Sequence, residues 1–139
     1  MERKIAIEGL KEDIVQVVCK IVQISKDNTI CFSNESNFIK LNSMQVLLRE
    51  EPNDIVNNIL HYNPNLTIFC NARGYLEVIK KYSSLLKSPP MVVLTGGGPN
   101  MVDQVYQIKR IEDKVIEVPL RIEYLLNTID SFFLEENKN

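Results

Sequence analysis

Two short runs, LTIFC (Leu66–Cys70) and MVVLT (Met91–Thr95), decide the fold of this chain. Both are almost continuously apolar, which is typical of strands that are covered on both faces of a parallel sheet. Amphipathic helical patterns separate these runs from their neighbours, and parallel strands need crossover connections of this kind, nearly always right-handed. The two runs therefore predict an α/β fold in which helices lie on both faces of a mostly parallel sheet.

Three further β-prone segments extend the predicted sheet in both directions along the chain. Arg3–Glu8 has the pattern of a strand that enters a turn at Gly9, and Thr29–Ser33 has that of a second strand. Lys114–Val118 is expected to be the last strand, closed by Pro119. Together these segments predict a doubly wound, flavodoxin-like sheet of five or six strands.

The segment 34–51 is irregular or inserted, and its pattern leaves two alternatives open. Asn37–Leu41 and Met44–Leu48 are either two short strands joined at Asn42-Ser43 or a short helix followed by one strand. The local pattern alone does not choose between these alternatives, because short apolar runs fit both helices and strands.

Apolar residues at i, i+3, i+4 and i+7 mark the inward faces expected of the helices. In the first helix this spacing selects Leu10, Ile14, Val17, Val18, Ile21 and Ile24. In the last helix it selects Ile122, Leu125, Leu126, Ile129, Phe132 and Phe133. We expect both faces to pack on the sheet.

The composition is that of an ordinary globular protein, and it limits the classes of partner. The 139 residues suit a single domain over 1–139 with a frayed polar tail at 135–139. The formal net charge of -2 argues against nucleic acid as a partner, because phosphate binding needs a concentrated basic surface. No apolar run reaches the roughly 18–20 residues that span a bilayer, and the first residues lack a signal-peptide core. We therefore expect a cytoplasmic protein that binds neither nucleic acid nor membrane.

The cysteine and histidine usage gives no support to a metal site. The cysteines Cys19, Cys31 and Cys70 form no CxxC pair, and His61 is the one histidine. A structural zinc site needs four such ligands at short spacings. We expect three reduced thiols, neither a metal nor a cofactor, and a solvated His61 at the end of a helix.

Three segments carry a resemblance to a known family: PNLTIFC (Pro64–Cys70), PMVVLTG (Pro90–Gly96) and VIEVPLRIEYLL (Val115–Leu126). They resemble the third strand, the fourth strand, and the fifth strand with the last helix of response-regulator receiver (CheY-like) domains. The match covers roughly residues 52–133. The resemblance implies a role in bacterial two-component signal transduction. It also implies a third strand ending in a phospho-accepting Asp, a fourth ending in Thr or Ser, and a fifth ending in a Lys-Pro pair with a cis peptide bond.

The residues at the positions of the family's phosphorylation chemistry depart from its pattern. The acceptor position falls on Cys70, with Asn71 beside it, and the Lys position falls on Val118, whereas Thr95 and Pro119 match. The aromatic residue expected in the fifth strand is replaced by Val115.

The acidic pair that holds Mg²⁺ in the family falls on Glu8-Gly9 if Arg3–Glu8 is the first strand, or on Ser33-Asn34 if Thr29–Phe32 is. Either alignment leaves at most one carboxylate, and Mg²⁺ is usually held by one or two carboxylates together with phosphate oxygens. The sequence therefore predicts a pseudo-receiver: a non-enzymatic, phosphorylation-independent module that binds a protein partner.

The resemblance also implies where a partner binds. In the family, the fourth helix, fifth strand and fifth helix form a common interaction face, which mediates homodimers as well. The residues expected on this face are Tyr106, Lys109, Arg110, Glu117, Arg121 and Tyr124. Tyr and Arg are the residue types enriched at binding hot spots.

Two other functions remain as alternatives. Gly96, Gly97 and Gly98 form a strand-to-helix turn whose amides could bind the anionic group of a small ligand or a nucleotide, although Pro99 removes one donor. A thiol-dependent enzyme built on Cys70 would need a neighbouring cation to lower the pKa of the thiol, and it ranks last.

Overall fold

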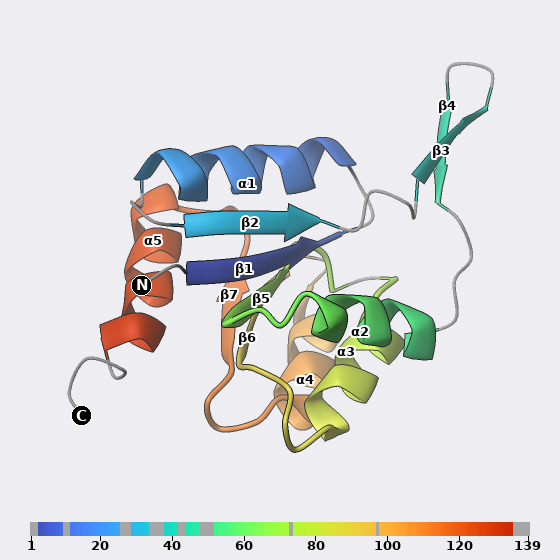
Figure 1. Ribbon diagram of the computed structural model, residues 1–139. Helices are drawn as coiled ribbons and strands as arrows, with labels where there is room; N and C mark the ends of the chain where they lie inside the picture. Colours follow the sequence, from blue (N-terminus) through green and yellow to red (C-terminus); the bar gives the residue numbers. More distant parts are fainter. Residues whose placement is uncertain are drawn as a thin grey trace.

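The computed structural model describes residues 3–9, 12–25, 29–33, 38–41, 44–47, 52–72, 74–96 and 98–134 (Figure 1). Five strands form one sheet in the order β2-β1-β5-β6-β7, and every neighbouring pair is parallel. The strands are β1 (Arg3–Glu8), β2 (Thr29–Ser33), β5 (Leu66–Phe69), β6 (Met91–Thr95) and β7 (Lys114–Glu117). This arrangement confirms the predicted doubly wound α/β fold.

Helices cover both faces of the sheet (Figure 1). One face carries α1 (Glu12–Ser25) and α5 (Ile122–Leu134). The other face carries α2 (Pro52–His61), α3 (Leu76–Ser84) and α4 (Pro99–Ile108). No helix in the described segments is both long enough and apolar enough to cross a membrane.

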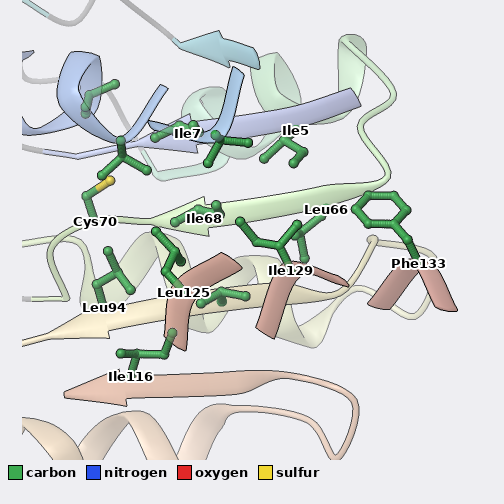
Figure 2. Packing of buried hydrophobic residues seen from close by; sticks show 14 residues of the cluster. Ile5, Ile7, Leu66, Ile68, Cys70, Leu94, Ile116, Leu125, Ile129 and Phe133 are labelled. Atoms are coloured by element: carbon green, nitrogen blue, oxygen red, sulfur yellow. The ribbon is translucent and has the colours of Figure 1, made fainter. Parts of the chain in front are cut away.

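The core is divided by the sheet into two hydrophobic clusters, because successive strand residues point to opposite faces. In β5, Leu66 and Ile68 pack toward α1 and α5, whereas Phe69 packs toward α2, α3 and α4. In β6, Val92 and Leu94 join the first cluster, which Figure 2 shows between the strands and the α5 residues. Because both faces are covered, both strand sequences are almost continuously apolar, as the sequence runs indicated.

The segment 34–51 contains an antiparallel pair of strands, β3 (Phe38–Leu41) and β4 (Met44–Leu47). The first of the two alternatives, two short strands, is thus confirmed. The pair forms a two-stranded sheet of its own, separate from the five-stranded sheet. The predicted turn at Asn42-Ser43 lies outside the described residues.

The inward face predicted for the first helix is partly wrong. Val15, Val18 and Val22 are the buried residues of α1, whereas Ile14 and Val17 are 40% and 55% exposed. Consecutive residues of a helix are rotated by about 100°, so a stripe displaced by one position presents a different side to the sheet. Leu10 and the side chain of Ile24 lie outside the described part of the chain.

The last helix follows its predicted face more closely. Leu125, Ile129 and Phe133 are buried against the sheet, and Phe132 packs beside them. Ile122, at the start of α5, is instead 50% exposed. The tail at 135–139 lies outside the described residues.

Candidate functional site

The carboxyl ends of the parallel strands bring the predicted receiver positions together in a row. Arg3–Glu8 forms β1, which lies between β2 and β5 and ends directly before Gly9, and the placement of the acidic pair at Glu8-Gly9 stays a prediction. The Cys70 N–H donates to the Glu8 carbonyl oxygen at 2.7 Å, and the Val118 N–H donates to the Thr95 carbonyl oxygen at 3.0 Å. Glu8, Cys70, Thr95 and Val118 therefore follow one another along this edge of the sheet.

Cys70 belongs to the hydrophobic core at this edge. It is 8% exposed and continues the row of Leu66 and Ile68 on the α1 and α5 face, as Figure 2 shows. Burial, with smaller contributions from the neighbouring Cys19 and Glu8, raises the pKa of the Cys70 thiol to about 12. A nucleophilic cysteine needs a lowered pKa, so this environment opposes the thiol chemistry considered above.

Gly9 leaves no free space for a side chain beside Cys70. A Cβ atom at position 9 would lie 3.0 Å from the Val15 Cγ2 atom and 3.2 Å from the Cys70 Cβ atom. The preceding residue, Glu8, is 4% exposed and pairs in register with Phe69, which packs on the α2, α3 and α4 side. Since register partners in parallel strands share a face, Glu8 and Cys70 lie on opposite faces of the sheet.

Cys19 and Cys31 are the other thiols of the described chain. Cys31 on β2 lies 3.9 Å from the Cys19 carbonyl oxygen, measured from its Sγ atom, and both residues pack beside the first hydrophobic cluster. The hydrogen bond with Cys19 and burial raise the pKa of Cys31. Within the described ranges, no three His, Cys, Asp or Glu side chains are grouped so as to hold a metal ion.

Close packing also governs the edge between β6 and β7. A Cβ atom at Gly96 would overlap the side chain of Val118, so only glycine fits there without movement of Val118. The Val118-Pro119 peptide bond is cis, as the resemblance implied. Thr95 is 1% exposed, and its Oγ1 atom has no hydrogen-bond partner. An unpaired buried hydroxyl costs about 1–3 kcal/mol, so Thr95 Oγ1 is an exception that calls for an explanation.

A pocket of about 420 Å³ opens beside Thr95; we call it the β6–β7 pocket. Its lining residues are Thr95, Gly96, Gly98, Val102, Asp103, Glu117 and Val118. The charged side chains among them are both carboxylates, which oppose the binding of an anion. The positive end of α4 at Gly98 favours an anion, but Pro99 is the first helical residue and has no N–H to offer. Gly97 lies outside the described residues.

The residues expected on the partner face have different surroundings. Tyr106 on α4 and Tyr124 on α5 are 52% and 57% exposed. Glu117 and Arg121 are exposed as well. Ile122, next to Arg121 in the sequence, is half exposed. The helical pattern did not indicate this, because it placed Ile122 on the inward face of the helix.

Arg110 is held inside the protein rather than presented on its surface. Its Nε and Nη2 atoms donate to Asp113 Oδ2 and Oδ1 at 3.0 and 3.1 Å, and its side chain is 17% exposed. Nη1 donates to the Ser88 carbonyl oxygen at 3.0 Å and Nη2 to that of Pro89 at 2.8 Å. The Lys109 Nζ atom donates to the Asp113 carbonyl oxygen at 3.3 Å, so Lys109 is tied to the same loop.

Asp113 organises this network, and our sequence reasoning missed it. Its side chain is fully buried and accepts hydrogen bonds from the Arg110 N–H at 2.9 Å and the Met91 N–H at 3.0 Å. The network joins the α4–β7 loop to the start of β6. Arg110 and Asp113 both lie in the loop after α4, outside any helix, so no helical spacing in the sequence indicated the pair.

Comparisons with known proteins find similarity in structure but not in sequence. No protein-family model matches the chain, and no curated protein matches it. The receiver domain protein (CheY-like) of Methanospirillum hungatei JF-1 is similar with a TM-score of 0.68 at 14% identity, covering 100% of both chains. A response-regulator signal receiver domain of Bermanella marisrubri has a TM-score of 0.68 at 12% identity, covering 96% of this chain and 99% of its own.

A third similar structure is a DNA-binding response regulator of the LuxR family from Staphylococcus aureus. It has a TM-score of 0.65 at 15% identity and covers 94% of this chain and 98% of its own. At sequence identities this low, the structural similarity shows the fold alone. The similarity covers nearly the whole chain. The chain has the fold of response-regulator receiver (CheY-like) domains.

Proposed function

We propose that this chain is a signalling module that keeps the receiver fold and binds a protein partner without being switched by phosphorylation. The observation that carries the proposal is Cys70, which stands at the strand end where the receiver resemblance implies an acceptor Asp. Its thiol is buried in the core, and its pKa is raised to about 12. A residue in this setting offers no carboxylate oxygen to a phosphoryl group.

The residues around Cys70 support the same proposal. Phosphoryl transfer in this fold needs Mg²⁺ held by carboxylates and a cation that stabilises the developing charge. Gly9 has little room for a second carboxylate, because a Cβ atom there would lie 3.0 Å from Val15 Cγ2 and 3.2 Å from Cys70 Cβ. Val118, at the position of the family's Lys, supplies an apolar side chain that packs on Gly96.

We propose that the partner binds the face formed by α4, β7 and α5. Tyr106 and Tyr124 would be its aromatic anchors, since both are more than half exposed and Tyr is enriched at binding hot spots. Glu117 and Arg121 would contribute polar contacts at the rim, and Ile122 adds apolar surface. The partner is either a different protein or a second copy of this chain, which would form a homodimer through the same face.

Arg110 and Lys109 do not belong to this surface in our proposal. The guanidinium of Arg110 is committed to Asp113 and to the carbonyl groups of Ser88 and Pro89. The Lys109 ammonium is bound to the carbonyl groups of Arg110 and Asp113. Replacing either residue would therefore affect the structure of the α4–β7 loop rather than the contact with a partner.

The proposal is tested first by its chemistry. The protein is incubated with acetyl phosphate and Mg²⁺, and its intact mass is measured against a catalytically competent receiver domain as the positive control. We expect no adduct on this chain. A stoichiometric phosphoryl adduct that survives removal of the reagent would refute phosphorylation independence.

The partner face is tested separately with matched variants. Tyr106→Ala and Tyr124→Ala are compared with Leu86→Ala, which removes a fully exposed leucine from the loop between α3 and β6. Sedimentation measures self-association, and affinity capture from the source cell measures binding of another protein. We expect the two tyrosine variants to lose an association that the wild type and Leu86→Ala retain. An association that all variants keep would exclude this face.

A further inference from the structure

We propose that the β6–β7 pocket binds a small organic cation, an ammonium or guanidinium compound. Its volume of about 420 Å³ falls within the range of roughly 300–1,000 Å³ that is usual for small-molecule sites. Three independent features point to such a ligand: an unpaired hydroxyl on the wall, carboxylates as the charged lining groups, and apolar side chains between them.

The hydroxyl of Thr95 is the first feature. The residue is 1% exposed and lines the pocket, and its Oγ1 atom has no hydrogen-bond partner in the protein. Its main-chain carbonyl is already used, since it accepts a hydrogen bond from the Val118 N–H at 3.0 Å. Buried hydroxyls nearly always have a partner, so the orphan oxygen marks a place where a ligand group completes the site.

The charge of the lining is the second feature. Thr95 and Glu117 are register partners of parallel strands, so they lie on the same face of the sheet, the one that α4 covers. Asp103 faces the pocket from α4, and both carboxylates are at least partly in solvent. Among the lining residues that the structure describes none is basic, so these groups attract a cation and repel an anion. Hydrogen bonds from an ammonium group to carboxylates are among the strong ones.

The apolar lining is the third feature. Val102 on α4 and Val118 after β7 lie on the wall together with Gly96 and Gly98. These surfaces suit a short carbon chain, which would pack against the two valines. A bare metal ion would make no apolar contact with them. The predicted ligand thus carries a cationic head for Asp103 and Glu117 and a hydrocarbon part, with a polar group that reaches Thr95.

The experiment uses ethanolamine, putrescine and agmatine as probes, with ethylene glycol as the neutral counterpart and inorganic phosphate as the anion. Amide chemical shifts of the whole chain are followed by NMR during titration. We expect at least one amine to give saturable shifts centred on Thr95, Asp103 and Glu117, and we expect none from ethylene glycol or phosphate. The proposal is overturned if no amine binds, or if phosphate saturates the same residues.

Variants assign the binding to the pocket. Glu117→Gln and Thr95→Val should each weaken the binding of the amine by about tenfold, the effect of losing one hydrogen bond. Glu77→Gln, at an exposed position on α3, is the matched control and should leave the affinity unchanged. If Glu117→Gln and Glu77→Gln lost the same amount of affinity for the amine, the loss would come from the change in net charge alone, and the proposal would be overturned. Thr95→Val should fold at least as stably as the wild type, and a marked loss of stability would mean that the hydroxyl already serves the fold.

Discussion

Replacing Asp113 by alanine should destabilise the fold more than any surface change. The Asp113 side chain is fully buried, and it accepts hydrogen bonds from the Arg110 guanidinium, the Arg110 N–H and the Met91 N–H. The substitution removes all of these acceptors at once. It leaves the buried Met91 N–H at the start of β6 unpaired, and it leaves a largely buried guanidinium without its counter-ion.

The expected magnitude follows from these lost contacts. Removing one partner of a buried ion pair typically costs about 3–5 kcal/mol. The lower end of that range applies here, because the Arg110 side chain is 17% exposed and keeps the carbonyl groups of Ser88 and Pro89. About 3 kcal/mol is a large part of the roughly 5–15 kcal/mol that stabilises a typical domain. A loss of this size should lower the melting temperature by about 10 °C.

Urea unfolding followed by circular dichroism measures this free energy of unfolding. Glu112→Ala is the control, because Glu112 contacts the same guanidinium at 3.3 Å but its side chain is 55% exposed. An exposed pair of this kind is worth less than about 1 kcal/mol. The reasoning is refuted if Asp113→Ala and Glu112→Ala shift the urea midpoint equally, since burial would then not be what gives the pair its strength.

Three further perturbations test the packing of the edge and of the core. Gly96→Ala should lower the free energy of unfolding by about 1–3 kcal/mol, because its Cβ atom overlaps the Val118 side chain. Adding Val118→Ala should restore part of that loss. Strictly additive effects of the two substitutions in thermal unfolding would contradict this prediction. Native Cys70 should react with iodoacetamide far more slowly than in urea, and equal rates would contradict its raised pKa. Because folding raises that pKa from 9.0 to about 12, the stability that it contributes should be complete below pH 9 and lost as the pH rises toward 12. Cys70→Ser should reduce this change in urea titrations, and the part that remains belongs to groups such as Cys31, whose pKa is also raised. Tyr82→Phe removes the 2.9 Å hydrogen bond with Thr67 and should cost about 1 kcal/mol in urea unfolding, and a cost that persists unchanged in a Thr67→Val background would rule out this bond as its cause.

The sheet could be predicted from the sequence because burial on both faces leaves a distinctive pattern. Strands such as β5 and β6 are buried on both faces and are therefore apolar at nearly every position, a pattern that few other structures of that length require. The inward face of α1 could not be predicted with the same certainty. Two apolar stripes, displaced by one residue, compete in that helix, and only contact with the sheet selects Val15 over Ile14.

The candidate site could be predicted in its positions but not in its packing. The strand ends at Cys70, Thr95 and Val118 follow from the alternation of strands and helices, and the cis bond before Pro119 follows from the resemblance. The contact of Gly9 with Cys70 joins residues far apart in the chain, so no local pattern reports it. The same holds for the orphan hydroxyl of Thr95, which is defined by the absence of a partner in three dimensions.

The packing at the carboxyl ends of the strands bears on the proposed function. Its residues are matched in pairs: Gly9 is small where Cys70 and Val15 approach, and Gly96 is small where Val118 approaches. A side chain at position 9 would therefore press on Val15 and Cys70, and a carboxylate at position 70 would enter an apolar cluster at a high cost in desolvation. The contacts at Gly9 and around Cys70 therefore make this part of the edge apolar and closely packed. This packing supports the proposal that the chain is not switched by phosphorylation, because a phospho-accepting carboxylate would have no polar surroundings at position 70.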